Sequence, residues 1–316
     1  MCALYGFINY GKVLNQKELK RLVRCLSVAS ECRGRDASGV AYVRNGKIIV
    51  YKKPQPASEV NFYFPSDITI LTGHTRFATQ GNAKNNYNNH PFVGHTADGD
   101  FALCHNGMLF NYDYVRKLEK LPPSKIKTDT YAAVQLIEKY GQADFENIGK
   151  MSEIVNGSFV FTILTDEEKL FISRWDNPIC ILHFPKFGLY VYTSTKEIMQ
   201  TVVKGTILEK QPFDMIPVSE GEMISIDKQG AIERNRFVPV QENCFGYYDM
   251  YSAFSERDDY GSYLCEYGNM FGVSDEEIMM LYEMGYEDED IELMMMDHDM
   301  LRSCLNDAKE MIGIYM

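Results

Sequence analysis

The chain has 316 residues, of which 45% are hydrophobic and 24% are charged, and its formal net charge at pH 7 is −12. This length and composition are typical of a globular protein of one or two domains. No run of 18 apolar residues and no basic segment followed by an apolar one is present, which excludes a predicted transmembrane helix and a predicted secretory signal. The eight cysteines form no C-x-x-C pair, so they predict reduced thiols in a cytoplasmic protein.

The negative charge is concentrated at the C-terminal end of the sequence. Residues 244–316 contain 18 acidic and 3 basic side chains, a net charge of −15, whereas residues 1–243 contain 26 acidic and 29 basic ones, a net charge of +3. Nucleic-acid binding requires clustered lysine and arginine side chains, which the acidic segment lacks. The composition therefore predicts a nearly neutral domain at 1–243, an acidic, Tyr- and Met-rich segment at 244–316, and no nucleic-acid partner.

Short strands separated by turns dominate the first part. A hairpin is predicted around Asn45-Gly46, because these residues readily adopt the positive φ angles of a two-residue turn. Apolar residues at helical spacing predict helices at 16–31 and 129–140, with Thr128 as the N-cap of the second, and a third helix is expected at 145–155. The predicted strands cover residues 3–10, 40–43, 47–52, 68–73, 101–105, 158–165, 169–173, 180–184, 189–193 and 222–227. Many strands with few helices predict an α+β fold, with sheets packed as layers between helices.

The acidic segment divides into two stretches. Residues 245–271 are rich in Tyr, Asp, Ser and Gly, and they are expected to form a linker with little regular structure. A capping-box pattern at 274–277 and apolar residues at helical spacing predict three short helices, at 275–283, 287–296 and 299–312. With the Met284-Gly285-Tyr286 turn they resemble a ubiquitin-associated-type three-helix bundle. We expect the apolar face of the last helix to dock a separate protein; the alternative is a small appendage or a stabilising cap on the first domain.

Cys2 is a candidate nucleophile because of its position. If Met1 is removed, Cys2 carries a thiol and a free α-amine on one carbon, and the small second side chain favours that removal. The α-amine has a pKa of about 7.7–8.0 and the thiol one of about 8.5, so one residue supplies both a base and a nucleophile near neutral pH. At this point the alternative is a cysteine that merely begins a buried strand.

Three downstream segments carry further candidates. Arg76 lies in the segment His-Thr-Arg-Phe-Ala-Thr-Gln-Gly after a predicted strand, where it is either a ligand clamp or part of a surface ion pair. Asn106 and Gly107 offer an amide side chain and a backbone N–H, the two donors that an oxyanion hole requires, although an Asn-Gly turn is the common alternative. Asp129 stands at a predicted helix start, where it either complements the helix dipole or binds a cation.

Together these segments resemble the class II glutamine amidotransferases, the glutaminase domains of the N-terminal-nucleophile hydrolases. The resemblance covers roughly residues 2–240 and keeps the family's order. Its motifs are Cys-Ala-Leu-Tyr-Gly at 2–6, Arg-Gly-Arg-Asp-Ala-Ser-Gly at 33–39, the arginine segment at 74–81, Asn-His-Pro at 89–91, His-Asn-Gly at 105–107, Thr-Asp-Thr at 128–130 and Asn-Gly-Ser-Phe at 156–159. The resemblance implies a four-layer αββα sandwich of two antiparallel sheets, followed here by a small α-helical acidic tail.

The resemblance also implies roles for the candidate residues. Cys2 attacks the side-chain amide of glutamine, and the Asn106 side chain and the Gly107 backbone N–H hold the oxyanion. Arg76 binds the substrate α-carboxylate, which suits the planar fork of a guanidinium. Asp129 binds the substrate α-ammonium.

The segment around the arginine departs from the family's usual pattern. Phe77 stands where the family often has Trp, Gln80 stands where it often has His, and Ala37 replaces a usual Ser. These positions shape the rim of the substrate pocket, and Phe77 and Thr79 are expected to contact the substrate. Arg33 is expected to support the nucleophile without taking part in the chemistry.

The implied reaction converts glutamine and water to glutamate and ammonia through a cysteinyl thioester, with no cofactor and no metal ion. The six histidines show no metal-ligand spacing. The 73 residues after the domain are too few for a synthetase domain, so we expect either a separate ammonia-acceptor protein or an enzyme that acts alone. Two alternatives stay open: a hydrolase of another γ-glutamyl amide, and a non-catalytic interaction protein that retains the fold.

Overall fold

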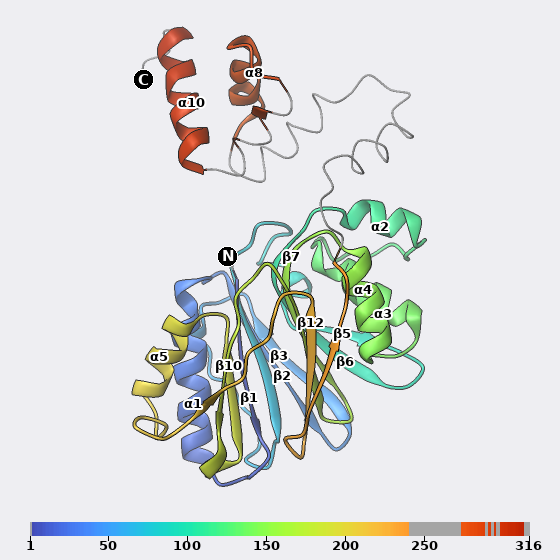
Figure 1. Cartoon of the computed structure of the whole chain (residues 1–316), viewed down its shortest axis with the longest axis vertical. Coiled ribbons are helices and arrows are strands. Elements are labelled where there is room, and N and C mark those ends of the chain that lie inside the picture. The colour runs from blue at the N-terminus through green and yellow to red at the C-terminus, as the bar shows by residue number, and fades with distance from the viewer. Residues whose placement is uncertain (1, 240–272, 288–289, 292–293, 295–297, 313–316) are drawn as a thin grey trace. The chain divides into compact units, whose positions relative to one another are not determined.

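The computed structural model describes residues 2–239, 273–287, 290–291, 294 and 298–312. It divides the chain into two compact units, residues 1–240 and residues 241–316. In the first unit, two β-sheets lie face to face with helices on their outer sides (Figure 1). The second unit contains the helices α8 and α10.

Sheet A of the first unit has seven strands in the order β11-β9-β10-β1-β4-β2-β3, and each strand is antiparallel to its neighbours. The strands are β1 (Ala3–Asn9), β2 (Ala37–Arg44), β3 (Lys47–Lys53), β4 (Ile70–Arg76), β9 (Cys180–Phe184), β10 (Leu189–Thr193) and β11 (Asp214–Met215). The first strand of the chain is therefore the middle strand of this sheet, which buries it from both sides.

Sheet B has six antiparallel strands in the order β13-β12-β8-β7-β6-β5. They are β5 (Phe92–His95), β6 (Asp100–Leu109), β7 (Gly157–Thr165), β8 (Lys169–Trp175), β12 (Glu222–Asp227) and β13 (Ile232–Arg236). The sequence did not predict β5, β11 or β13. These strands lie at sheet edges, and β13 (Ile-Glu-Arg-Asn-Arg) has no alternation of apolar and polar residues to mark it.

Helices form the two outer layers (Figure 1). On the side of sheet A lie α1 (Gln16–Ala29) and α5 (Lys196–Lys204), and on the side of sheet B lie α3 (Thr130–Tyr140) and α4 (Phe145–Ile154). The remaining helical segments are α2 (Tyr112–Leu118) and the 3-10 turns η1 (Ser30–Cys32), η2 (Ala57–Glu59), η3 (Asn86–Asn88) and η4 (Pro185–Phe187). The predicted four-layer αββα sandwich is thereby confirmed.

The alternation of side chains along β1 shows how the layers are held together. Tyr5 and Phe7 point into the apolar cluster shared with α1, whereas Leu4 and Ile8 belong to the cluster between the two sheets. Successive residues of a strand face opposite sides, so a strand in a middle layer needs apolar residues on both faces, as β1 has from Ala3 to Ile8. A third cluster joins sheet B to α3 and α4 and is centred on phenylalanines such as Phe161.

Helix α1 begins and packs as its sequence predicts. The Asn15 side chain accepts hydrogen bonds from the backbone N–H groups of Lys17 and Glu18, and the Glu18 carboxylate accepts one from the Asn15 N–H. This capping box satisfies donors that a helix start otherwise leaves open. The buried residues Leu19, Leu22, Val23, Leu26 and Ser27 lie on the face toward sheet A.

Two boundaries differ from the prediction at positions that matter for function. Strand β6 continues to Leu109, so Asn106 and Gly107 lie inside the strand and not in a turn that follows it. Gly107 pairs with Phe159 of β7. Helix α3 has Asp129 at its N-cap position, without a capping hydrogen bond from the side chain, so the prediction of Thr128 at that position was wrong by one residue. The Thr128 hydroxyl is buried without a hydrogen-bond partner among the described residues.

The second unit is a small helical bundle with its own core. Ser274 and Glu277 form the predicted capping box at the start of α8 (Asp275–Glu283), and Gly285, at φ +89°, allows the turn that follows. The described part of the predicted middle helix is helical at Asp290, Ile291 and Met294, and α10 spans His298–Ile312. The predicted linker at 245–271 lies outside the described residues.

The apolar residues of α10 are used inside this unit. Leu301 and Leu305 are buried together with Ile278 and Leu281 of α8, whereas Met300 is 48% exposed. The expectation that the apolar face of the last helix docks a separate protein is therefore wrong for Leu301 and Leu305, because those side chains already fill the core of the bundle.

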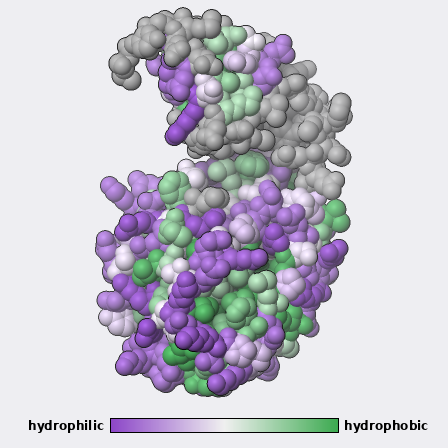
Figure 2. All heavy atoms as spheres, turned by 60° about the vertical axis from the view of Figure 1, so that its left-hand side comes forward, coloured by the Kyte–Doolittle hydropathy of each residue, from purple (hydrophilic) through white to green (hydrophobic). Residues whose placement is uncertain are grey.

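The surface of the first unit is mixed in character. Figure 2 shows hydrophilic residues over much of its visible face, with apolar patches between them. Large apolar side chains that stay exposed include Phe77, Phe213 and Met215. Among the described residues, every helix is too short or too polar to span a bilayer.

Candidate active site

The strand register brings the start of β1 next to the end of β4. Ala3 pairs with Thr75, so Cys2 and Arg76 come from adjacent strands at the same end of sheet A. The Cys2 thiol lies 3.5 Å from the Phe77 carbonyl oxygen, to which it donates a weak hydrogen bond. The candidate nucleophile and the candidate clamp are thus placed together by backbone pairing.

Cys2 is half-buried and held by its backbone. The Arg33 Nε donates a hydrogen bond of 2.8 Å to the Cys2 carbonyl oxygen, which agrees with the supporting role expected for Arg33. Desolvation raises the pKa of the Cys2 thiol above its ordinary value; the Asp129 charge adds to this rise and the Arg76 charge opposes it. The thiol is therefore protonated at neutral pH and needs a base before it can attack an amide.

Asn106 is a buried amide whose polar atoms have no partner. It is 0% exposed, and neither its Nδ2 nor its Oδ1 is hydrogen-bonded among the described residues. A buried polar group without a partner costs free energy, roughly 1–3 kcal/mol, so the fold retains this amide against a stability cost. A buried polar group of this kind calls for a specific explanation, and a catalytic role is one of those known in native proteins.

Gly107 occupies a backbone conformation that other residues rarely adopt. Its φ is +144°, and a Cβ atom at this position would lie 1.8 Å from the Ser158 carbonyl oxygen. The position therefore requires glycine on steric grounds. Strand β6 consequently presents an amide side chain and a glycine N–H in succession.

Asp129 ties the start of α3 to the end of β6. Its Oδ2 accepts a hydrogen bond of 2.8 Å from the Leu109 N–H, and its Oδ1 accepts one of 3.3 Å from the Thr130 hydroxyl. The same hydroxyl lies 2.8 Å from Nδ1 of His105. The carboxylate is thereby fixed within the electrostatic range of Cys2 and Arg76, whose pKa values it influences.

Arg76 is 3% exposed, and its guanidinium holds the loop that follows β4. One terminal nitrogen donates to the Asn89 Oδ1 at 2.7 Å, and the other donates to the carbonyl oxygens of Gly81, at 2.8 Å, and Gln80. These contacts account for three of the five N–H donors of an arginine. Burial lowers the pKa of Arg76, and the nearby Asp129 and Asp36 carboxylates oppose this effect.

The two remaining candidates lie in that loop. Phe77 is 52% exposed, and Thr79 is also exposed. The Ala78 N–H donates to the Asp36 carboxylate at 2.8 Å, which anchors the loop on the side of β2. The structure thus gathers Cys2, Arg76 and Asp129, and leaves Phe77 and Thr79 at the surface.

His90 is a further buried group near this site, and the sequence predicts no role for it. Both of its ring nitrogens are buried and unpartnered among the described residues, and its ring lies 4.1 Å from that of His74. Burial places the pKa of His90 well below its ordinary value, and it lowers the pKa of His74 to about 3. Both imidazoles are therefore neutral. The one signal in the sequence was the place of His90 in the Asn-His-Pro segment.

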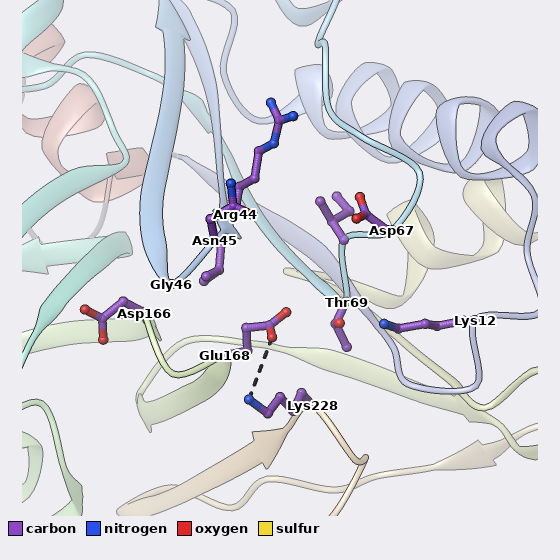
Figure 3. Close-up of a pocket in the computed structure, with 11 residues that line it drawn as sticks. Lys12, Arg44, Asn45, Gly46, Asp67, Thr69, Asp166, Glu168 and Lys228 are labelled. Atoms are coloured by element: carbon purple, nitrogen blue, oxygen red, sulfur yellow. Dashed lines mark ion pairs between the residues drawn. The ribbon is translucent and has the colours of Figure 1, made fainter.

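A separate groove lies at the opposite end of the sheets, beside the β2–β3 turn. Figure 3 shows the cations Lys12, Arg44 and Lys228 and the acidic residues Asp67, Asp166 and Glu168 around it, with Lys228 directed toward Glu168. The Lys228 and Glu168 side chains form an ion pair at 3.9 Å, and the three cations and three acidic residues that line the groove have no net formal charge. In the part of the chain that the structure describes, no group of three His, Cys, Asp or Glu side chains could hold a metal ion.

Comparisons with known proteins point to one family. The family profile described as "Glutamine amidotransferase domain" matches residues 74–199. The chain is 28% identical over 248 residues to a glutamine--fructose-6-phosphate aminotransferase of Staphylococcus aureus, covering 75% of this chain and 39% of that protein. The enzyme of the same name from Geobacillus kaustophilus is 30% identical over 190 residues, covering 57% of this chain and 30% of that protein. The chain therefore spans about two fifths or less of the length of these relatives.

Solved structures share the fold. A glutamine phosphoribosylpyrophosphate amidotransferase from B. subtilis superposes with a TM-score of 0.60 at 20% sequence identity, covering 75% of this chain and 49% of that one. A structure described as the allosteric regulatory enzyme of purine biosynthesis superposes with a TM-score of 0.59 at the same identity and coverage. Both likenesses concern the fold.

Proposed function

We propose that this chain acts as a class II glutamine amidotransferase, and that its first unit releases ammonia from the side-chain amide of glutamine through a thioester on Cys2. The observation that carries the proposal is the Asn106 amide, which is fully buried with both polar atoms unpartnered. The family's chemistry requires a donor for a developing oxyanion, and an unpartnered amide preceding Gly107 on β6 fits that need.

The proposed first step joins the Cys2 sulfur to the amide carbon of glutamine. The α-amine of Cys2, free once Met1 is removed, takes the thiol proton and delivers it to the departing nitrogen, so that ammonia leaves and a thioester remains. In the second step water attacks the thioester carbon, glutamate leaves, and the sulfur regains its proton. The raised pKa of the Cys2 thiol supports the need for this base, because a thiol that stays protonated is a poor nucleophile.

Binding of the zwitterionic end of glutamine is assigned to Arg76 and Asp129. The pairing of Ala3 with Thr75 places Arg76 beside Cys2, and the charge of Asp129 influences the pKa of both Cys2 and Arg76. The Arg76 donors that do not hold the loop suit a carboxylate, and Asp129 suits an ammonium. Phe77 and Thr79 lie on the same loop, and we assign them to the rim that closes on the substrate.

The fate of the ammonia is the second part of the proposal. The curated relatives are named as aminotransferases that act on fructose 6-phosphate, and this chain matches two fifths or less of their length. We propose that the ammonia passes to an acceptor carried by a different polypeptide region or by a separate protein. In an assay that contains only this chain and glutamine, the ammonia has no acceptor. The reaction detected is then the hydrolysis of glutamine to glutamate and ammonia, which is one part of the complete transfer reaction.

A direct assay separates glutamine from other γ-glutamyl amides. The purified chain is incubated with glutamine and, in parallel, with a γ-glutamyl alkylamide, and glutamate, ammonia and free amine are measured. The proposal expects glutamate and ammonia in equal amounts from glutamine and slower release of amine from the alkylamide. Faster turnover of the alkylamide would show that glutamine is not the preferred substrate.

The Arg76→Lys variant tests the assigned clamp. We expect KM for glutamine to rise about tenfold or more with a smaller change in kcat, because an ammonium lacks the directed donors with which the Arg76 guanidinium holds Asn89, Gln80 and Gly81 and still has donors left for a carboxylate. The matched control is Lys84→Ala, which removes an exposed cation from the same loop and should leave both constants unchanged. An unchanged KM in Arg76→Lys would remove Arg76 from substrate binding.

A further inference from the structure

Lys52 is a half-buried cation on β3 that makes no ion pair with any described residue. Its ammonium instead donates hydrogen bonds to two backbone carbonyl oxygens, those of Asn89 and Pro91, the second at 2.9 Å. It also lies 5.1 Å from the centre of the Phe92 ring. Burial lowers the pKa of Lys52 to about 8. Removing an ammonium from water is unfavourable unless its N–H groups find other acceptors. For Lys52 these acceptors are the two carbonyl oxygens, so the lysine is bound to the segment that contains Asn89 and Pro91.

The segment that Lys52 holds is the one that orients Arg76. Asn89 is 0% exposed, and its side-chain Oδ1 accepts the 2.7 Å hydrogen bond from Arg76. The Asn89 Nδ2 donates to the Ala83 carbonyl oxygen at 2.8 Å and to the Asn86 Oδ1 at 3.1 Å. Asn89 therefore joins Lys52, through its backbone, to Arg76, through its side chain.

The surrounding packing leaves this segment no room to move toward β2. A Cβ atom on Gly39 would lie 2.3 Å from the His90 carbonyl oxygen and 2.9 Å from Cδ of Pro91. A further hydrogen bond runs from the segment to β3, where the Asn86 Nδ2 donates to the Lys52 carbonyl oxygen at 2.9 Å. Residues 86–91 are thus clamped to the β2–β3 hairpin by Lys52 and by close backbone contact.

We propose that Lys52 is a positioning residue for substrate binding, which fixes Asn89 and through it one arm of the Arg76 guanidinium. The inference rests on the proposed function, in which Arg76 binds the α-carboxylate of glutamine. Lys52 does not touch the substrate in this account. Its effect is on the orientation of Arg76, and it should therefore appear in KM and not in the bond-breaking step.

The test compares Lys52→Met with wild type and with a matched control. The methionine keeps the length and apolar character of the side chain but removes its charge and its donors. We expect KM for glutamine to rise about tenfold, the size of a lost charge-assisted hydrogen bond, and kcat to stay within about twofold. Lys53→Met removes the next lysine of β3, which is exposed, and should change neither constant. Lys52→Arg should restore most of the affinity, because it retains charge and donors.

A double-mutant cycle then shows whether Lys52 acts through Arg76. If it does, Lys52→Met should add much less than its own effect when introduced into Arg76→Lys. Additive effects, a fall in kcat without a rise in KM, or a Lys52→Met variant with wild-type kinetics would each overturn the inference. Lys52→Gln serves as a second variant; if neither neutral variant folds while Lys52→Arg does, the role is structural and the inference fails. A wild-type chain without activity on glutamine would instead overturn the proposed function.

Discussion

Replacing Cys2 by alanine is expected to abolish release of ammonia from glutamine, with kcat lowered by about 10⁴-fold or more, as for loss of a catalytic nucleophile in other hydrolases. Without the Cys2 sulfur no thioester forms at this position. Two of the other described free thiols, Cys104 and Cys180, are buried, and burial raises the pKa of both. The measurement is steady-state glutamate production, with a melting curve to show that the variant is folded.

Two further cysteine variants sharpen this result. Cys2→Ser keeps the α-amine and a hydroxyl nucleophile, so a small residual activity is expected. Cys25→Ser changes a half-buried thiol on α1 that donates a hydrogen bond to the Gly205 carbonyl oxygen. The serine hydroxyl can make the same hydrogen bond, so full activity is expected. Normal turnover by Cys2→Ala would show that the nucleophile lies elsewhere.

The Asn106→Ala variant should have the second largest effect. We expect kcat to fall by roughly 10²–10³-fold with a smaller change in KM, because an oxyanion donor acts mainly on charge that develops in the transition state. Since the Asn106 amide has no partner among the described residues, its removal breaks no hydrogen bond within the described structure. The melting temperature should therefore not fall, and the loss of activity can be assigned to the chemistry.

The matched control is another buried asparagine at the far end of the same sandwich. Asn9 ends β1 and is 1% exposed, and its Oδ1 is likewise unpartnered among the described residues. Asn9→Ala should leave kcat unchanged. If Asn106→Ala altered only KM, or if Asn9→Ala lowered kcat as much, the oxyanion role of Asn106 would be wrong.

Much of the fold could be predicted because it follows from local patterns. The apolar run that became β1, the Asn45-Gly46 hairpin, the capping box of α8 and the spacing of apolar residues in α1 each carry a physical signal within a few residues. The short edge strands carried no such signal. β11 has two residues, and β13 is largely charged, so their pairing depends on neighbours far away in the sequence.

The candidate site was less predictable, because its geometry depends on contacts between distant segments. The sequence indicated that Asn106 and Gly107 could donate hydrogen bonds, but it could not show that β7 extends the strand through both of them. It assigned Arg76 to a substrate without showing that Gln80, Gly81 and Asn89 already bind the guanidinium. Lys52 looked like any other lysine of a hairpin, since its partners lie 37 and 39 residues further along the chain.

Covalent labelling by a diazo ketone analogue of glutamine tests the central claim most directly. The analogue enters as glutamine does and alkylates the attacking nucleophile, and intact mass followed by peptide mapping locates the adduct. We predict one adduct per chain, on Cys2, in a protein whose first residue is Cys2 and whose activity is lost in proportion to labelling. An active chain that retains Met1, or an adduct on another cysteine, would contradict the mechanism.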